Sequence, residues 1–424
     1  MGTFAKTAKL IIAQMRNNQE YDRISVLEDL IPLFEPHKFW DSQPVPKVTD
    51  QLSLSEEQFD CPIETKSVDD IPEEPYALPV QYSWDDLDLA DDTVAEEVYD
   101  LLVRNYVEVD EVIFRFDYSI PFLRWSLMPP NGNPRWLVGV RAGKRKKLFG
   151  MITAIPVTMM LKGQEVLCAE VNFLCVHKDL RTKRLAPVLI KEVTRRINRC
   201  NIWQAIYTSG TTIPTPFTGA AYWHRSLNPK KLIEVRFSYK PAKQSMAQYL
   251  KRHYLSSQLE LPSLRLMQDA DVPQVTVLLN NHLSSKTKVH ITYSEEEVRH
   301  FFLPREDVIN TFVDGGAPGE TLTDIFSYYY LPSSVLNHPQ HNLLKVAYSY
   351  YNASTTGRLK EGMRDMLIRA KEQGCDVFNA LDVMENKQHF EELKFGIGDG
   401  LLHYYLYNWR VKEVGPEDLG IVLV

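Results

Sequence analysis

Apolar and polar positions in the first half of the chain predict two helices and four strands. The helical segments repeat apolar residues every three or four positions, which is the spacing of an amphipathic helix; they cover residues 91–105 and 183–199. The strand-like segments are apolar and bounded by turns; they cover residues 136–140, 148–161, 166–176 and 203–208. A helix separates the last two strands, so we expect this pair to be parallel.

The second half of the chain repeats this order of elements. Helical spacing recurs at residues 272–283 and 359–371, and strand-like segments recur at 308–313, 325–331, 344–351 and 376–381. Equivalent positions, such as Val171 and Ala347, lie about 175 residues apart, and a near-constant offset of this kind indicates a duplication. The pattern predicts an α/β fold with a mixed sheet, in which two similar lobes are related by internal pseudo-symmetry.

Residues 36–80 depart from this pattern because they are rich in proline and acidic side chains. Such a composition predicts an extended arm that lies over the body of the protein. We therefore expect three parts: an N-terminal arm at 1–80, an N-terminal lobe at 81–240 and a C-terminal lobe at 241–424.

The overall composition is that of a globular protein, with 44% hydrophobic and 24% charged residues. The formal net charge of −7 and the pI near 5.9 argue against nucleic-acid binding through bulk charge. The basic run at residues 144–147 lies between two predicted strands, so we interpret it as a solvated hairpin turn.

The cysteine pattern indicates the cellular compartment, and the lengths of the apolar runs indicate whether the chain crosses a membrane. Five cysteines are scattered without a CxxC pair. This pattern is typical of a reducing compartment and argues against a structural zinc site, so we expect a cytoplasmic protein. No apolar run approaches about 18 residues, the length at which a transmembrane helix is indicated.

The segment at residues 170–187 is the first candidate for chemistry. A strand-like apolar run ends there in a basic turn, residues 181–184, which opens the predicted helix at 183–199. The N-terminus of a helix has unpaired N–H groups and a partial positive charge. Together with the basic side chains, it is a place to hold phosphate.

The order of elements in each half is similar to that of GNAT-type acyl-CoA transferases, and two local sequences are more specific. The runs EVNFLCVHK at 170–178 and KFGIGDG at 394–400 closely resemble the two signatures of the glycylpeptide N-tetradecanoyltransferase, or N-myristoyltransferase, family. The resemblance continues through HKFW, QPVP, FRFDY, YWHRSLNP and YYLYNW, at 37–40, 43–46, 114–118, 222–229 and 404–409. It covers nearly all of the chain from residue 36 onward.

The resemblance implies an acyltransferase that moves the tetradecanoyl (myristoyl) group of myristoyl-CoA to the amine of an N-terminal glycine. A thioester is already activated, so the reaction needs stabilisation of the tetrahedral oxyanion and removal of a proton from the glycine ammonium. In the family, backbone N–H groups that match Phe173 and Leu174 form the oxyanion hole, and such donors are worth about 3–4 kcal/mol each. Asn172 and Thr208 match positions that orient the glycine amine.

The family's base is the C-terminal α-carboxylate, here on Val424, folded into the centre of the protein. A free α-carboxyl has a pKa of about 3.5 and an α-amine one of about 7.8, so proton transfer is uphill by about 6 kcal/mol. Burial raises the first pKa and lowers the second, which narrows the gap. The apolar run at 419–424 agrees with a buried end. Without the resemblance we would interpret it as a final edge strand that only packs.

The resemblance also implies the binding positions. The myristoyl-CoA positions are His37, Lys38, Phe39, Trp40, Phe173, Leu174, Cys175, Val176, Arg181, Thr182, Lys183, Arg184, Leu185, Ala186 and Pro187. The peptide positions are Tyr106, Val107, Glu108, Asp110, Phe114, Phe116, Tyr118, Gly210, Tyr222, His224, Phe237, Tyr329, Ser333, Tyr348, Asp399 and Gly400. Their acidic members would meet basic residues downstream of the glycine, although Val109 interrupts an acidic run that is usually longer in the family.

The expected partners are therefore myristoyl-CoA, as a co-substrate, and the N-terminal glycine peptides of nascent or cleaved proteins. We expect a monomer with no metal, no permanently bound cofactor, no nucleic-acid partner and no transmembrane segment.

Two other functions remain open at this point. One is a GNAT-like transferase of another acyl chain, because the sequence does not show the depth of the acyl pocket. The other is a non-catalytic protein that binds acyl-CoA or a lipidated peptide. A thiol nucleophile at Cys175 is the weakest alternative, since a buried strand cysteine without a basic partner is normally inert.

Overall fold

The computed structural model describes residues 33, 35–106, 113–315 and 321–424. The elements of the first half are α3 (Asp50–Ser53), β1 (Tyr82–Asp86), α4 (Asp92–Asn105), β2 (Phe114–Phe116), α5 (Ile120–Leu127), β3 (Leu137–Ala142), β4 (Lys147–Leu161), β5 (Gln164–Val176), α6 (Leu185–Asn198), β6 (Gln204–Ser209), β7 (Thr218–Ser226), α7 (Pro229–Glu234) and α8 (Met246–Arg252). Those of the second half are β8 (Arg265–Leu266), α9 (Val272–Lys286), β9 (Val289–Thr292), α10 (Glu295–Phe302), β10 (Ile309–Asp314), β11 (Asp324–Tyr330), β12 (Ser333–Val335), β13 (Leu343–Leu344), β14 (Val346–Ser354), α11 (Leu359–Glu372), β15 (Val377–Leu381), α12 (Lys387–Phe390), β16 (Gly396–Tyr407) and β17 (Leu419–Gly420).

A mixed sheet runs through both halves, which confirms the predicted fold class. The sheet has 14 strands in the described residues, and its main order is β1-β3-β4-β5-β6-β16-β7-β15-β14-β11-β10-β8. Strands β5 and β6 are parallel, as predicted, and so are β14 and β15. In the middle, β16 from the second half pairs with β6 and β7 of the first half, so the two halves share one sheet.

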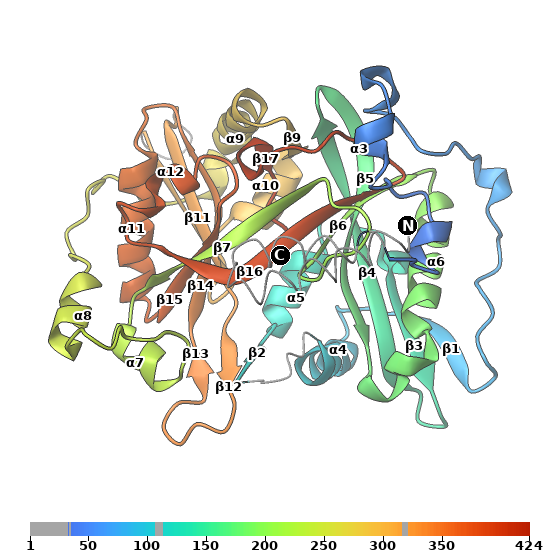
Figure 1. The fold of residues 1–424 in the computed structure, drawn as a ribbon, viewed down its shortest axis with the longest axis horizontal. Helices are drawn as coiled ribbons and strands as arrows, with labels where there is room; N and C mark the ends of the chain where they lie inside the picture. The colour runs from blue at the N-terminus through green and yellow to red at the C-terminus, as the bar shows by residue number, and fades with distance from the viewer. Residues whose placement is uncertain (1–32, 34, 107–112, 316–320) are drawn as a thin grey trace, which may run out of the picture.

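The two halves use the same layering, which agrees with the predicted pseudo-symmetry. In the first half, α4 packs with Met151 on one face of the sheet, whereas α6 packs with Ile152 on the other. In the second half, α9 packs with Ile325 and α11 packs with Phe326. Adjacent residues of a strand point to opposite faces, so each half is a sheet between two helices. Figure 1 shows α6 and α11 at opposite ends of the molecule and the C-terminus in the middle.

Most predicted elements lie within a few residues of the observed ones, and one boundary was wrong for a clear reason. The helix expected from residue 183 begins at Leu185, after a 3₁₀ turn at Lys178–Lys183. Arg184 adopts a left-handed conformation with φ +57°, and such a residue ends a right-handed segment. Residues 144–146 of the basic run lie in the exposed β3–β4 turn, as predicted, and Lys147 begins β4. The division into three parts at residues 80 and 240 stays a prediction.

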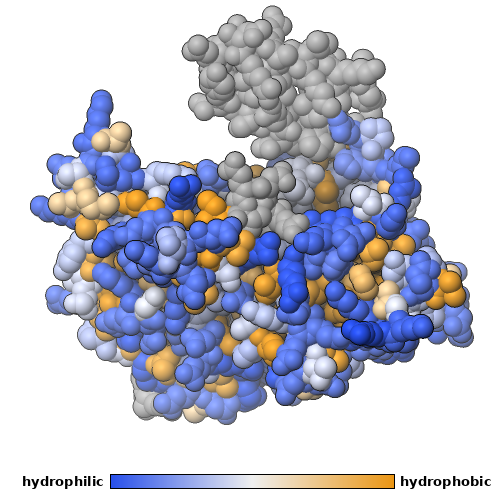
Figure 2. Space-filling model, turned by 90° about the horizontal axis from the view of Figure 1, so that it is seen from below, coloured by the Kyte–Doolittle hydropathy of each residue, from blue (hydrophilic) through white to orange (hydrophobic). Residues whose placement is uncertain are grey.

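The surface seen from below is mostly hydrophilic, with hydrophobic residues in separate small patches (Figure 2). Within the described ranges, no helix is both long enough and apolar enough to cross a bilayer.

Candidate active site

The site begins at a bulge near the end of β5. The pairing with β4 joins Thr153 to Asn172 and then Met151 to Cys175, so Phe173 and Leu174 together face one residue of β4. A bulge of this kind takes backbone groups out of the regular ladder. Phe173 accordingly has a left-handed backbone with φ +49°, which is uncommon for a bulky residue and marks a position held by its surroundings.

Asn172 connects this bulge to the end of the chain. Its side-chain oxygen accepts a hydrogen bond of 2.9 Å from the backbone N–H of Phe173. Its side-chain NH₂ donates a short hydrogen bond to a main-chain oxygen of Val424. The amide of Asn172 therefore links a bulge donor directly to the last residue.

Tyrosines hold the last residues in the core. The backbone N–H of Val422 donates to the hydroxyl of Tyr351 at 3.1 Å, and the hydroxyl of Tyr404 donates to the carbonyl of Ile421 at 3.2 Å. Leu419 pairs with β9, but residues 421–424 are assigned to no strand. The edge-strand interpretation was therefore wrong for these residues, and the buried end is confirmed.

One cavity of about 860 Å³ is lined by the β5 bulge, by Asn172 and by the last two residues of the chain, Leu423 and Val424. Its lining includes every predicted catalytic residue: Asn172, Phe173, Leu174, Thr208 and Val424. It also includes the predicted peptide residues that the structure describes: Tyr106, Phe114, Phe116, Tyr118, Gly210, Tyr222, His224, Phe237, Tyr329, Ser333, Tyr348, Asp399 and Gly400. Val107, Glu108 and Asp110 lie outside the described residues.

The part of the cavity lined by α6, called here its first branch, is mostly apolar, although Thr194 and Asn198 also line it. Ile190, Val193 and Ile197 line it from the inner face of the helix, and Ile152 lines it from β4. Val193 and Ile197 belong to the apolar face that the helical spacing predicted, whereas Ile190 does not, and the sequence pattern gave none of the three a ligand contact. Their role as lining was therefore missed because core packing and channel lining have the same sequence pattern.

The other branch of the cavity is lined by aromatic and polar side chains. Tyr329 and Tyr348 stack with ring centroids 5.2 Å apart, and Phe237 contacts the rings of Phe114 and His224. The imidazole Nδ1 of His224 lies 2.6 Å from the side-chain oxygen of Asn379. Burial lowers the pKa of His224, although Asn379 and Asp399 act in the opposite direction.

The hydroxyls in this branch stay protonated. Burial raises the pKa of Tyr222 to about 12, and it raises those of Tyr106 and Tyr348 still further. At neutral pH these residues offer neutral O–H groups beside apolar rings, which suits an extended peptide with small side chains.

Glu170, two residues before Asn172, is a buried carboxyl group that the sequence analysis did not single out. Burial raises its pKa to about 8, while the amide of Asn172 acts in the opposite direction. Glu170 is therefore mostly neutral at pH 7.

The N-terminal arm reaches the cavity through Trp40. Its indole stacks on Tyr207 with a centroid distance of 5.6 Å and an interplanar angle of 6°, and Tyr207 stacks on Tyr405. Asn408 donates its backbone N–H to the carbonyl of Pro44 at 2.7 Å, which ties the arm to the segment after β16.

The predicted phosphate turn lies apart from the cavity lining. Arg181, Thr182, Lys183 and Arg184 are exposed at the N-terminus of α6. Arg181 donates to the carbonyl of Asn105, the last residue of α4, at 2.5 Å. Arg181 thus positions the turn against α4, and the exposed side chains after it face solvent.

The remaining predicted CoA positions also lie outside the cavity lining. His37, Lys38 and Phe39 belong to the arm, whereas Val176, Leu185, Ala186 and Pro187 flank the turn. Cys175 is buried and its thiol lies 3.9 Å from the carbonyl of Leu101, an environment that gives no activation as a nucleophile. Cys175 therefore has a structural role, as a buried residue next to the bulge.

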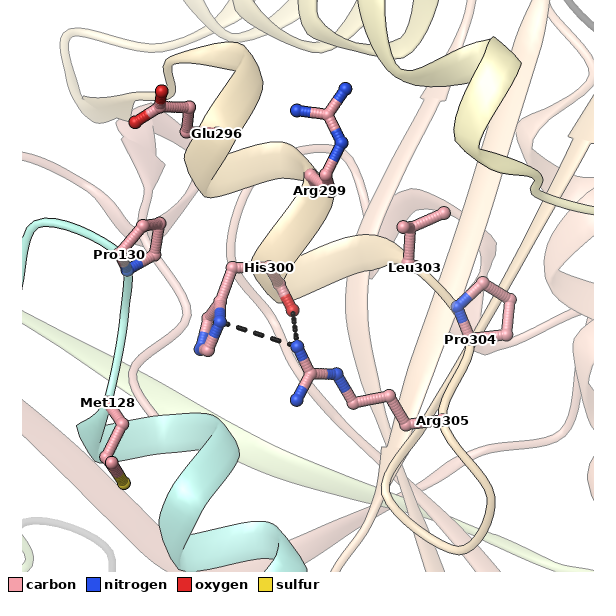
Figure 3. A pocket seen from close by; sticks show the side chains of 8 residues that line it. All are labelled: Met128, Pro130, Glu296, Arg299, His300, Leu303, Pro304 and Arg305. Carbon is pink, nitrogen blue, oxygen red and sulfur yellow. Dashed lines mark hydrogen bonds between the residues drawn. The ribbon is translucent and has the colours of Figure 1, made fainter. Parts of the chain in front are cut away.

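A second pocket lies between the end of α5 and α10 (Figure 3), and it shares no lining residue with the first cavity. Arg305 donates to the carbonyl of His300 at 3.1 Å, and Arg299 pairs with Asp269 at 2.7 Å. The imidazole Nε2 of His300 lies 2.7 Å from the carbonyl of Trp125. These side chains are engaged in local contacts, so the pocket does not compete as a reaction site. No metal-binding cluster occurs in the part of the chain that the structure describes.

Known proteins share both the sequence and the fold. The sequence model of the N-terminal domain of myristoyl-CoA:protein N-myristoyltransferase matches residues 62–220, and the model of its C-terminal domain matches residues 234–420. Glycylpeptide N-tetradecanoyltransferase 2 of Danio rerio is 50% identical over 387 residues, which is 91% of this chain and 77% of the relative. Glycylpeptide N-tetradecanoyltransferase 1 of Arabidopsis thaliana is 48% identical over 94% of this chain and 91% of the relative.

A solved structure gives the same result. The crystal structure of Saccharomyces cerevisiae N-myristoyltransferase with bound myristoyl-CoA superposes with a TM-score of 0.87 at 35% identity. The match covers 92% of this chain and all of the yeast chain, 100%.

Proposed function

The chain belongs to the N-myristoyltransferase family and is an acyltransferase, and we propose that it transfers the tetradecanoyl group of myristoyl-CoA to the amine of an N-terminal glycine. The observation that carries the proposal is the single cavity that joins an apolar channel, the β5 bulge and the end of the chain. Acyl transfer to an amine needs these three features together: a place for the chain, donors for the oxyanion and an acceptor for a proton.

The acyl chain lies along α6, and the CoA that carries it lies at the N-terminus of this helix. The apolar face of Ile190, Val193 and Ile197 receives the hydrocarbon, and the exposed Lys183 and Arg184 face the phosphates of CoA. Charge-assisted hydrogen bonds to phosphate are short and strong, and the helix N-terminus adds its partial positive charge. Trp40 of the N-terminal arm lines the same cavity and stacks on Tyr207.

The bulge supplies the oxyanion hole. In the structure the N–H of Phe173 is bonded to the side-chain oxygen of Asn172, so this donor changes its acceptor when the thioester carbonyl arrives. The neighbouring N–H of Leu174 is the second donor. The backbone is already fixed by the left-handed Phe173, so little reorganisation is needed when negative charge develops on the oxygen.

The α-carboxylate of Val424 acts as the base. The glycine ammonium loses one proton to it, and the neutral amine attacks the thioester carbon, which forms the C–N bond and the tetrahedral oxyanion. Collapse of this intermediate breaks the C–S bond, and the second proton of the nitrogen passes to the departing sulfur, so that CoA leaves as the thiol. Asn172 holds the carboxylate through its NH₂ group, and Thr208 lies in the same lining to orient the amine.

The aromatic branch receives the peptide. Its neutral tyrosine hydroxyls and His224 hydrogen-bond an extended main chain, and Asp399 faces a basic residue downstream of the glycine. We further propose that the enzyme works in the cytoplasm on nascent or cleaved proteins, in keeping with its five free cysteines.

Mass spectrometry tests the proposal. Purified protein is incubated with tetradecanoyl-CoA and a Gly-Xaa-Xaa-Xaa-Ser peptide, and the expected product is a peptide heavier by one tetradecanoyl group on its N-terminal amine. Parallel reactions with acetyl-CoA and palmitoyl-CoA measure the choice of chain. Product from either of these, with none from tetradecanoyl-CoA, contradicts the proposal and favours a transferase of another acyl chain.

A further inference from the structure

One surface of the protein differs in charge from the rest of the chain. Residues 229–254, which contain α7 and α8, carry seven basic side chains and one acidic side chain, whereas the whole chain has a net charge of −7. Figure 1 shows α7 and α8 at the end of the molecule opposite α6, which bears the proposed CoA turn. This charge is therefore not part of the phosphate site.

The basic side chains of this segment divide into those that pair within the fold and those that form no ion pair there. Lys230 and Lys231 pair with Glu234 and Asp376. In contrast, Lys243, Lys251 and Arg252 are exposed and form no ion pair within the described parts of the chain. Their charges are available to an external anion.

Apolar side chains are exposed on the same short helix. Met246 and Leu250, one helical turn apart, are 40% and 39% exposed, while Tyr249 between them is buried. Side chains four apart lie on one face of a helix, so α8 anchors itself through Tyr249 and turns Met246 and Leu250 outward. Tyr254, directly after the helix, is 69% exposed.

We propose that this surface, formed by Lys243, Met246, Leu250, Lys251, Arg252 and Tyr254 and called the α8 surface, docks on an anionic lipid membrane. Basic residues beside outward aliphatic and tyrosine side chains are the pattern of a helix that lies in a bilayer interface. Tyrosine rings are suited to the headgroup level. The two aliphatic side chains favour lipid over nucleic acid, because bases stack on aromatic rings and not on methionine or leucine.

The α8 surface is joined by a short segment to the proposed peptide site. Phe237, which lines the aromatic branch of the cavity, lies in the segment between α7 and α8. Docking through α8 thus holds the rim of the proposed peptide site near a membrane, where an acylated product inserts. This use rests on the proposed function, whereas membrane binding itself needs no turnover.

Vesicle flotation tests the docking. The full chain is mixed with vesicles of phosphatidylcholine alone, or of two parts phosphatidylcholine to one part phosphatidylserine, without either substrate. We expect binding to the second vesicle only, and weaker binding at high salt. Each basic residue near an anionic membrane contributes about fivefold in affinity, so the triple variant Lys243→Gln, Lys251→Gln, Arg252→Gln should bind about a hundredfold more weakly.

Two further variants separate this surface from bulk charge. The matched control is Lys144→Gln, Arg145→Gln, Lys146→Gln in the exposed β3–β4 turn, which removes the same charge but has no exposed large apolar neighbour at residues 141–149. This control should bind vesicles like the unchanged protein. The pair Met246→Ser, Leu250→Ser should weaken binding and leave a remainder that high salt abolishes.

Three outcomes overturn the docking proposal: no binding to anionic vesicles, an equal loss in the β3–β4 control, or retention of vesicle binding in the triple variant. Fluorescence anisotropy with single-stranded RNA adds a fourth, since loss of RNA binding without loss of vesicle binding would assign the surface to nucleic acid. Turnover of a short soluble peptide without vesicles is measured for every variant and should not change. A failed transfer reaction with intact vesicle binding would contradict the proposed function alone.

Discussion

The side-chain amide of Asn172 donates a hydrogen bond to the main chain of Val424, 252 residues further along the sequence. The same amide accepts from the backbone of Phe173 at 2.9 Å. One side chain thus sets the distance between the proposed oxyanion hole and the proposed base, which are the two groups that the reaction must bring together.

Replacing Asn172 should therefore slow the chemical step. Asn172→Leu keeps the size of the side chain but removes both hydrogen bonds. Hydrogen bonds to charged groups contribute about 1.5–3 kcal/mol, so kcat should fall by about 10- to 100-fold, with little change in the affinity for myristoyl-CoA. Single-turnover kinetics and a direct binding measurement separate these two quantities.

The control for Asn172 is Thr153→Val. The hydroxyl of Thr153 donates to the main-chain carbonyl of Asn172 at 2.9 Å, so its removal loosens the same residue without touching its amide. A loss in Thr153→Val as large as that in Asn172→Leu would mean that the site responds to general loosening, and that the amide has no special role.

Changing the end of the chain should abolish turnover. Deleting Val424, or adding one residue after it, moves the carboxylate away from Asn172, and a general base is worth about 10²–10⁴ in rate. Val424→Ala keeps the carboxylate in place and should remain active, so it serves as the control. Equal activity in the extended variant would show that the base lies elsewhere. Binding of myristoyl-CoA, measured by calorimetry, should persist in all three.

Gly398 should be required for peptide binding. A Cβ added there would overlap the imidazole of His224 and lie 3.0 Å from the carbonyl oxygen of Tyr222. Gly398→Ala therefore displaces His224 from Asn379, and KM for the peptide should rise at least about tenfold while binding of myristoyl-CoA stays unchanged. Gly396→Ala is the matched control, because its Cβ would meet no atom within 4 Å. An unchanged peptide KM in Gly398→Ala would remove His224 from the peptide site.

Glu170 should make stability depend on pH. Burial raises its pKa to about 8 in the folded protein, whereas an unfolded glutamate titrates near pH 4.3. As pH rises through this window, the unfolded state ionises first, so the contribution of Glu170 to the free energy of unfolding falls until about pH 8 and is then constant.

Glu170→Gln lacks this titration and should gain stability relative to the unchanged protein between pH 5 and pH 8, by up to about 4 kcal/mol. Thermal unfolding at both pH values measures the difference. The control is Glu165→Gln, because Glu165 is exposed near the start of the same strand. This variant should shift Tm equally at the two pH values. A pH-independent difference for Glu170→Gln would mean that the buried carboxyl group is ionised.

The sequence by itself determined the main helices and most of the strands beside them, although it missed β7 and β16, which join the two halves of the sheet. Helical spacing placed α4, α6 and α11 to within a few residues, because packing of one apolar face on a sheet is a local requirement that leaves a periodic pattern. The helix between β5 and β6 fixed their parallel pairing, since a crossover leaves no other arrangement in one sheet. The two signature runs led to the correct family.

Only the tertiary structure decided which residues meet. The left-handed backbone conformations of Arg184 and Phe173 have no signal in the sequence, because the turn and the bulge around these residues impose them. Ile190 and Ile197 look like core residues and line a channel, because an apolar cavity and an apolar core use the same side chains. The contact between Asn172 and Val424 leaves no periodic trace, since it forms only when the whole mixed sheet has closed around the last residues of the chain.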